Sequence, residues 1–142
     1  MKHPLIASAA LAATLLAASC SDSYQDDVHS APRAVQAWEN VDLSGYDQTQ
    51  LLGHLNLLAS EAVTAAAEGK YVEFHHLEVA LTPALTALEA KASGNAAALK
   101  TIETLKDLAV KLHLAGHDGN VKAGVKLGAA ISDLTARLAT EL

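Results

Sequence analysis

The sequence predicts an all-α protein, an antiparallel up-down-up-down four-helix bundle that follows a signal peptide and a flexible tether. Beyond Gly45 the apolar residues recur at spacings of three and four, which is the period of a helix. The composition is 51% hydrophobic but only 4% aromatic, so Ala, Leu and Val must fill the core, and this favours helices over sheets. The connections between the periodic stretches are short, and short connections make neighbouring helices antiparallel.

Residues 1–19 have the layout of a secretory signal peptide. Lys2 gives a charged start, residues 5–16 form an apolar run too short to span a bilayer, and three small residues follow. The sequence LAASC at residues 16–20 resembles the lipobox of bacterial lipoproteins, in which cleavage precedes a cysteine that is then acylated. Ala17 stands where the lipobox usually has a branched aliphatic residue, so ordinary signal cleavage after Ser19 is the alternative.

Lipidation of Cys20 would anchor the chain to a membrane. Cys20 is the only cysteine, and a lone thiol at the start of an exported chain is a liability unless it is modified. Ser21 resembles the sorting pattern that permits transfer to the outer membrane, so we expect a lipid-anchored, periplasm-facing envelope protein. Residues 20–45 would be the lipidated cysteine and the tether, and residues 46–142 the bundle. Trp38, the only tryptophan, is expected to dock on the bundle.

Four helices are expected, at about residues 47–68, 70–92, 95–115 and 120–140. Each has an apolar stripe at helical spacing. In chain order the stripes comprise Leu51, Leu55, Leu58, Ala62 and Ala66; Phe74, Leu77, Leu81, Leu85 and Leu88; Ile102, Leu105, Ala109 and Leu112; and Leu127, Ile131, Leu134 and Leu138. The turns are expected at Gly69, at Ser93-Gly94-Asn95, and at Gly116 with Gly119.

Three residues inside these helices need a reason. Pro83 predicts a kink in a helix that continues past it, because the apolar stripe of residues 74–88 is unbroken across the proline. Gly124 and Gly128 lie one turn apart near the start of the last helix and favour close approach of a neighbouring helix. Room for a ligand is the alternative.

Charge and composition exclude several functions. The formal net charge is −6 and no stripe of Lys and Arg is present, so a nucleic-acid partner is not expected. One cysteine permits no intramolecular disulfide and no cysteine-based zinc or iron–sulfur site. An enzyme is not expected, because the sequence shows no nucleophile with an evident base, no phosphate-binding glycine loop and no carboxylate pair spaced for acid–base chemistry.

Seven histidines are many for a chain of 142 residues. His75 and His113 are each 19 residues from Gly94, so an antiparallel hairpin places them at the same level. His117 follows His113 by one turn, the spacing at which two imidazoles on one helix can bind one ion, and His76 is adjacent to His75. His75, His113, His117 and His76 are therefore the predicted metal ligands, with zinc or copper(II) as the ion. Haem bound non-covalently by His75 and His113 is an alternative cofactor.

The same end of the bundle offers carboxylate oxygens from Glu68, Glu73, Glu78 and Asp118. At about 100° per residue His113 falls at the boundary of its apolar stripe, whereas His75 and His117 lean toward solvent. The alternative to a metal site is therefore a set of partly exposed histidines on polar faces.

A sequence pattern extends over the residues from Tyr71 to Leu138. It comprises Phe74-His75-His76-Leu77, Leu81, Ala84-Leu85, Leu112-His113, Asp118, Val121 and Gly128. The pattern resembles a family of short exported helical proteins of no established function, in which a histidine early in one helix and another late in the next recur. The resemblance implies that His75 and His113 are the pair to test, and it implies no reaction.

Two functions fit these observations. The first is an envelope lipoprotein that binds a transition metal, or haem, through histidines at one end of the bundle. The alternative is a structural or interaction lipoprotein that presents a helical surface to an envelope protein partner and has no cofactor.

Overall fold

Four helices make up most of the structure. This computed structural model describes residues 28–29 and 32–142, so the predicted signal peptide and Cys20 lie outside the described residues. The helices are α1 (Gln48–Ala67), α2 (Tyr71–Lys91), α3 (Ala96–His117) and α4 (Val121–Glu141), and no strand occurs in the described part. The prediction of an all-α fold with four helices is confirmed for these residues. None of the described helices is both long and apolar enough to cross a membrane.

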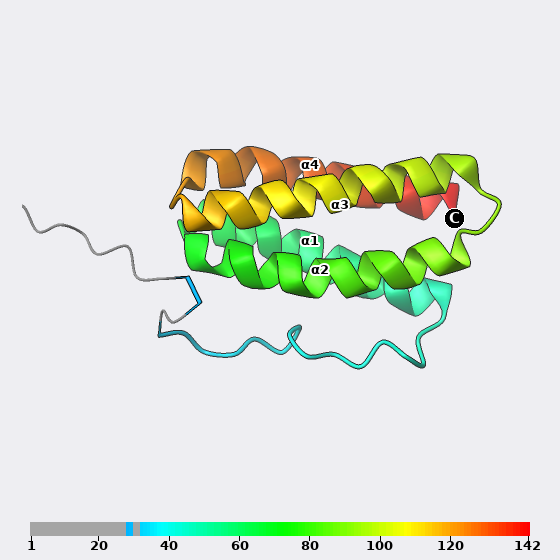
Figure 1. Ribbon diagram of the computed structural model, residues 1–142, viewed down its shortest axis with the longest axis horizontal. Helices are drawn as coiled ribbons and strands as arrows, with labels where there is room; N and C mark the ends of the chain where they lie inside the picture. The colour runs from blue at the N-terminus through cyan, green and yellow to red at the C-terminus, as the bar shows by residue number, and fades with distance from the viewer. Residues whose placement is uncertain (1–27, 30–31) are drawn as a thin grey trace, which may run out of the picture.

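The helices close a bundle in which each packs on the next in the chain and α1 packs on α4 (Figure 1). The chain runs along the bundle in alternating directions, as the colours in Figure 1 show. The α1–α2 and α3–α4 turns therefore lie at one end, and the α2–α3 turn lies at the other. This is the antiparallel arrangement expected from the short connections.

The turns between helices contain glycines with positive φ, at Gly69, Gly94 and Gly119. Gly116, which the sequence placed in the last turn, lies instead inside α3, so this helix continues to His117. Gly116 is buried, and a Cβ there would stand 3.0 Å from the carbonyl oxygen of Tyr71. Its missing side chain lets the end of α3 approach the start of α2.

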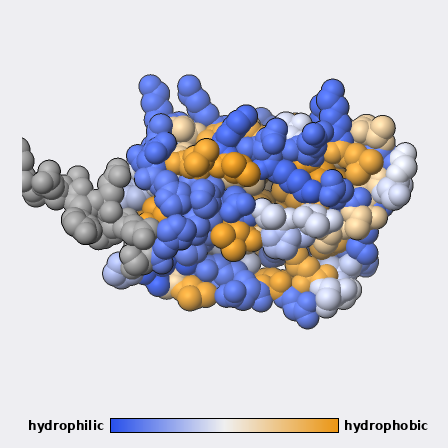
Figure 2. Space-filling model, viewed as in Figure 1, coloured by the Kyte–Doolittle hydropathy of each residue, from blue (hydrophilic) through white to orange (hydrophobic). Residues whose placement is uncertain are grey.

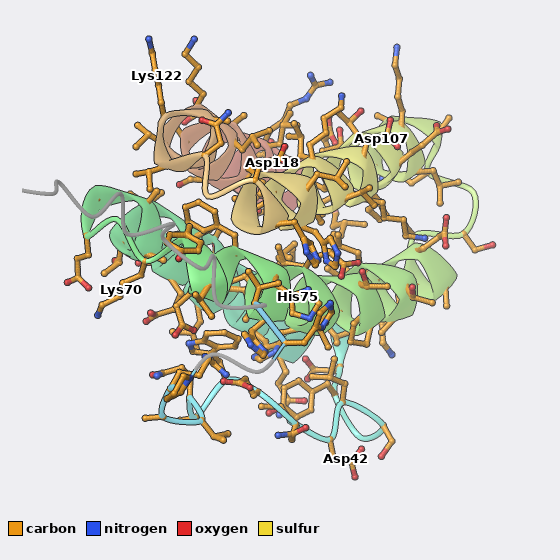
Figure 3. The ribbon with its side chains drawn as sticks, turned by 60° about the vertical axis from the view of Figure 1, so that its left-hand side comes forward. Asp42, Lys70, His75, Asp107, Asp118 and Lys122 are labelled. Atoms are coloured by element: carbon orange, nitrogen blue, oxygen red, sulfur yellow. The ribbon has the colours of Figure 1, made fainter. Side chains whose placement is uncertain are left out.

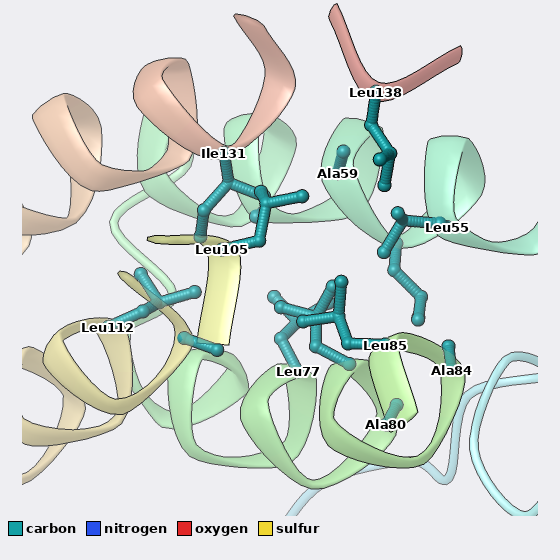
Figure 4. Close-up of a cluster of buried hydrophobic side chains, with 14 of the residues drawn as sticks. Leu55, Ala59, Leu77, Ala80, Ala84, Leu85, Leu105, Leu112, Ile131 and Leu138 are labelled. Carbon is teal, nitrogen blue, oxygen red and sulfur yellow. The ribbon is translucent and has the colours of Figure 1, made fainter. Parts of the chain in front are cut away.

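The predicted apolar stripes form the core, and those of the first three helices are buried throughout. Figure 4 shows leucines such as Leu77, Leu85 and Leu105 converging between the helices. In α4 the buried line differs from the predicted one, because Leu127 and Leu134 are only partly buried. The inner line of α4 runs through Gly124, Gly128, Ile131, Thr135 and Leu138.

The two glycines of α4 explain this difference. A Cβ on Gly124 would overlap the ring of Phe74, and a Cβ on Gly128 would stand 3.1 Å from the carbonyl oxygen of Ala62. The α4 backbone therefore packs directly on α1 and α2, which confirms the prediction of close packing. In α2 the helix also continues through Pro83, as expected.

The chain before α1 lies along the bundle beside α2 (Figure 1). We call residues 28–29 and 32–46 the N-terminal strap. Val28 and Trp38 are buried, with 3% and 6% of their surface exposed, so the predicted docking of Trp38 is confirmed. Arg33 links the strap to α2, because its guanidinium donates to Glu39 of the strap and lies 2.6 Å from the carboxylate of Glu73.

Candidate metal centre

Imidazole rings gather where the strap, α2 and α3 meet. His75 belongs to the first turns of α2, His113 and His117 to the last turns of α3, and His29 to the strap. The ring centroid of His75 lies 4.3 Å from that of His29, 4.5 Å from that of His113 and 5.5 Å from that of His117. We call these four residues the histidine cluster. Figure 3 shows His75 on α2 in this region.

The α2–α3 hairpin brings the cluster together. The Nδ1 atoms of His75 and His113 lie 3.1 Å apart, which confirms that the two residues share a level. His117 lies one helical turn beyond His113, and their ring centroids are 4.6 Å apart. The predicted spacing of these three histidines is therefore realised in the fold.

Three members of the cluster form a potential ligand set. One nitrogen each from His29, His75 and His117 lie within 4.8 Å of one another. In a tetrahedral zinc site the nitrogens are about 2 Å from the ion and hence about 3.3 Å from one another. The nitrogens have to approach one another by at most about 1.5 Å to reach that spacing, so the three residues are candidate ligands of one metal ion.

His113 is the fourth imidazole within reach, and a carboxylate backs it. Its Nδ1 lies 3.3 Å from Oε2 of Glu78 as well as 3.1 Å from Nδ1 of His75. A carboxylate beside a histidine accepts the ring N–H and so fixes the tautomer and orientation of the ring. Glu78 is therefore placed to orient His113 against the other rings.

His76 lies beside the cluster but faces the strap. Its ring centroid is 5.0 Å from that of His75, and its Nδ1 is 3.9 Å from Oε2 of Glu39. The structure thus brings together His75, His113 and His117 and directs His76 toward the carboxylate that Arg33 binds. The hydrogen bond from Arg33 also lowers the pKa of Glu39.

The other predicted carboxylates have separate places. Glu73 binds Arg33, Glu68 pairs with Lys70 at the surface, and Asp118 caps the end of α3. Of the four carboxylates, Glu78 is the one whose oxygen approaches a histidine of the cluster within the described chain. A carboxylate contribution to the site is therefore expected from Glu78.

His75 is electrically suited to bind a metal. Burial, together with repulsion from the neighbouring imidazoles, lowers the pKa of His75 to about 4. The ring is therefore neutral at pH 7, and a neutral imidazole offers a lone pair to an ion. The sequence placed His75 toward solvent, but only 9% of its surface is exposed, because the ring of His29 and the adjacent histidines cover it.

His29 is the cluster member that the sequence did not identify. It lies in the segment before the helices, so no helical spacing relates it to His75 or His117. The available signal was Trp38, because an apolar anchor in the strap implies that nearby strap residues also reach the bundle. The position of His29 itself follows only from the packed structure.

Haem would place a specific demand on His75 and His113. A porphyrin between them would hold the two ligating nitrogens about 4 Å apart, twice an iron–nitrogen bond of about 2 Å. Their Nδ1 atoms are 3.1 Å apart, so these two atoms are too close together to be the axial ligands of a haem.

No family model, curated protein or solved structure matches this chain.

Proposed function

We propose that this protein binds a transition metal ion, zinc or copper(II), through His29, His75 and His117, with His113 as the fourth ligand. The observation that carries the proposal is the set of three imidazole nitrogens within 4.8 Å of one another. Imidazole is a common ligand for both ions, and four nitrogens satisfy a tetrahedral zinc or a tetragonal copper(II) site.

Two further features support the proposal. His75 is neutral at pH 7, so an ion does not have to displace a proton from it. The chain also has a formal net charge of −6, which attracts cations toward its surface. The proposed role is binding rather than catalysis.

The proposed setting is the bacterial envelope, with cleavage before Cys20 and a lipid on that cysteine. The support is the LAASC sequence at residues 16–20 and the signal-peptide layout before it. Only nine residues lead from Cys20 to His29, which is at most about 30 Å of extended chain. The metal site would therefore lie close to the periplasmic surface of the outer membrane.

Titration calorimetry of the metal-free protein with zinc and with copper(II) tests the metal site. We expect a 1:1 complex whose affinity falls at least tenfold in His75→Ala and in His117→Ala, because each loses one ligand. His54→Gln is the matched control, since His54 lies on α1 and contacts Tyr46 rather than the cluster. Equal metal affinity in the wild-type protein and the three variants would contradict the assignment of a metal site to the histidine cluster.

A second candidate function rests on the surface of α3 and α4. Val110, Leu114 and Val125 are about half exposed there, and Leu114 and Leu127 line a groove of about 410 Å³ flanked by lysines. Figure 2 shows hydrophobic surface interspersed with hydrophilic surface in the upper part of the view, where α3 and α4 lie in Figure 1. Such a surface suits an interaction lipoprotein that docks an envelope partner. Leu114→Asp should then abolish co-purification from membranes without changing metal affinity.

A further inference from the structure

A cavity of about 230 Å³ lies between the strap and the first two helices. The strap contributes Trp38, Asn40 and Leu43 to its wall, α1 contributes His54, and α2 contributes His76 and Pro83. His76 thus separates the cavity from the histidine cluster, because its ring also contacts His75. The cavity is distinct from the candidate metal centre.

We propose that this cavity binds a small neutral ring compound that carries a hydroxyl group, with phenol as the simplest example. The proposal goes beyond the metal site and does not depend on an ion being bound there.

The size of the cavity fits such a compound. An apolar cavity of about 150 Å³ is large enough to hold benzene in a protein core. A cavity of about 230 Å³ therefore accepts one six-membered ring with a polar substituent. The walls suit a ring as well, since Leu43, Val79 and Pro83 provide apolar surface and Trp38 provides an aromatic one.

The cavity wall also carries polar groups that lack partners. His54 is only 9% exposed and forms no hydrogen bond within the described chain, its neighbour being the ring of Tyr46. Burial lowers the pKa of His54, so its imidazole is neutral and offers both an acceptor and a donor. A ligand hydroxyl can donate to or accept from this ring in the place of water.

Two residues of the wall have an unusual hydrogen-bonding state. Pro83 has no N–H, so the carbonyl oxygen of Val79 does not receive the usual helical hydrogen bond from residue 83. Among the described residues no acceptor reaches the buried indole N–H of Trp38. The indole N–H has almost no accessible surface, so the donor and the acceptor that a ligand hydroxyl can reach are the ring nitrogens of His54.

The charge of the wall favours a neutral ligand. Glu39 contributes a carboxylate to the wall, and this carboxylate binds Arg33. The guanidinium of Arg33 also binds Glu73, so both of its sides are occupied and it cannot bind an anionic ligand as well. An anionic ligand would meet the carboxylate of Glu39, and a cationic one would compete with Arg33. A neutral hydroxyl compound avoids both costs.

Proton–nitrogen NMR spectra of the full-length, metal-free chain titrated with phenol test the proposal. Trp38 is the only tryptophan, so its indole N–H gives one signal that reports on the cavity wall. We expect a saturable shift of this signal. His54→Phe should weaken binding about tenfold, because it removes one hydrogen bond. Ala80 of α2 also lines the cavity, so Ala80→Phe should abolish binding by filling it. Circular dichroism checks that both variants are folded.

His117→Ala separates this proposal from the metal site, because it should leave phenol binding unchanged while it weakens metal binding. A cavity that holds only water would show no saturable shift of the Trp38 signal in the wild-type protein. That result, or equal phenol affinity in a folded Ala80→Phe variant, would overturn the proposal.

Discussion

The Nδ1 atoms of His75 and His113 lie 3.1 Å apart although 38 residues separate them in the chain. Two neutral imidazoles approach this closely when one donates its N–H to the other, or when both bind one ion. Glu78 lies 3.3 Å from the same Nδ1 of His113, and its carboxylate favours a proton on that nitrogen. The proton of His113 is thus held between a carboxylate and the buried ring of His75, which leaves Nε2 as the nitrogen of His113 that can bind an ion.

Replacing Glu78 by Gln should weaken metal binding even though Glu78 is not among the three closest potential ligands. The amide is a weaker acceptor, so His113 loses the group that orients its ring, and we expect zinc affinity to fall by about tenfold to a hundredfold. Competition with a chromophoric chelator measures this affinity. Glu89→Gln is the matched control, because Glu89 lies further along α2 and pairs with Lys106 of α3. A similar change in both variants would contradict a specific role for Glu78.

Metal binding should fasten the strap to the bundle, because His29 is the ligand that the strap supplies. Trp38 and the pair of Arg33 with Glu73 hold the strap without metal. An ion adds one more attachment, and this should reduce local opening of the strap. Trypsin cleavage after Arg33, followed by mass spectrometry, should therefore be slower with zinc than without it.

Two comparisons make this test specific. In His29→Ala zinc should no longer slow cleavage after Arg33. Cleavage after Arg137, which is exposed on α4, should be the same with and without zinc in both proteins. Zinc protection that persists in His29→Ala would mean that the strap supplies no ligand.

The helices were predictable because their signals are local. The expected first helix, residues 47–68, agrees with Gln48–Ala67, since the capping box of Asp47 with Gln50 and the glycine at position 69 mark its ends. The inner face of α4 was predicted less well. Glycines carry no apolar side chain, so a hydropathy pattern selects Leu127 and Leu134 over the more deeply buried Gly124 and Gly128.

The candidate site was predictable only where the hairpin determines it. Equal distances from Gly94 suffice to bring His75 and His113 abreast. The burial of His75 and the arrival of His29 depend instead on how the strap folds back over α2. No periodic pattern encodes that contact, because it joins an irregular segment to a helix far along the chain.

Gly124→Ala should destabilise the fold, because the added methyl group overlaps the ring of Phe74. Phe74 is fully buried, so its ring has to shift within the packed core, and we expect a loss of about 1–3 kcal/mol in the free energy of unfolding. Gly53→Ala is the matched control, since Gly53 is exposed in α1 with open space at its Cβ position. There the higher helix propensity of Ala should stabilise by up to about 1 kcal/mol. Urea denaturation measures both, and equal changes would contradict close packing at Gly124.

The low pKa of His75 should make the metal-free protein less stable in mild acid. In the unfolded chain His75 takes up a proton near its ordinary pKa of 6.5, whereas in the folded protein it does so only near 4. Between these values the unfolded state binds more protons, so the free energy of unfolding falls as the pH falls from 6.5 to 4. Across the whole window the free energy of unfolding falls by about 3 kcal/mol, and above pH 6.5 it no longer changes with the titration of His75.

His75→Gln isolates this contribution, because glutamine is polar and does not titrate. Urea denaturation of both proteins, with chelator present, gives the difference in unfolding free energy at each pH. The wild-type protein should lose unfolding free energy relative to the His75→Gln variant as the pH is lowered from 7 to 4. Groups remote from the cluster, such as His54, titrate alike in both proteins and cancel. A difference independent of pH would mean that the ring of His75 is protonated as readily in the fold as in water, and a ring so accessible to protons would not be the buried centre of the cluster.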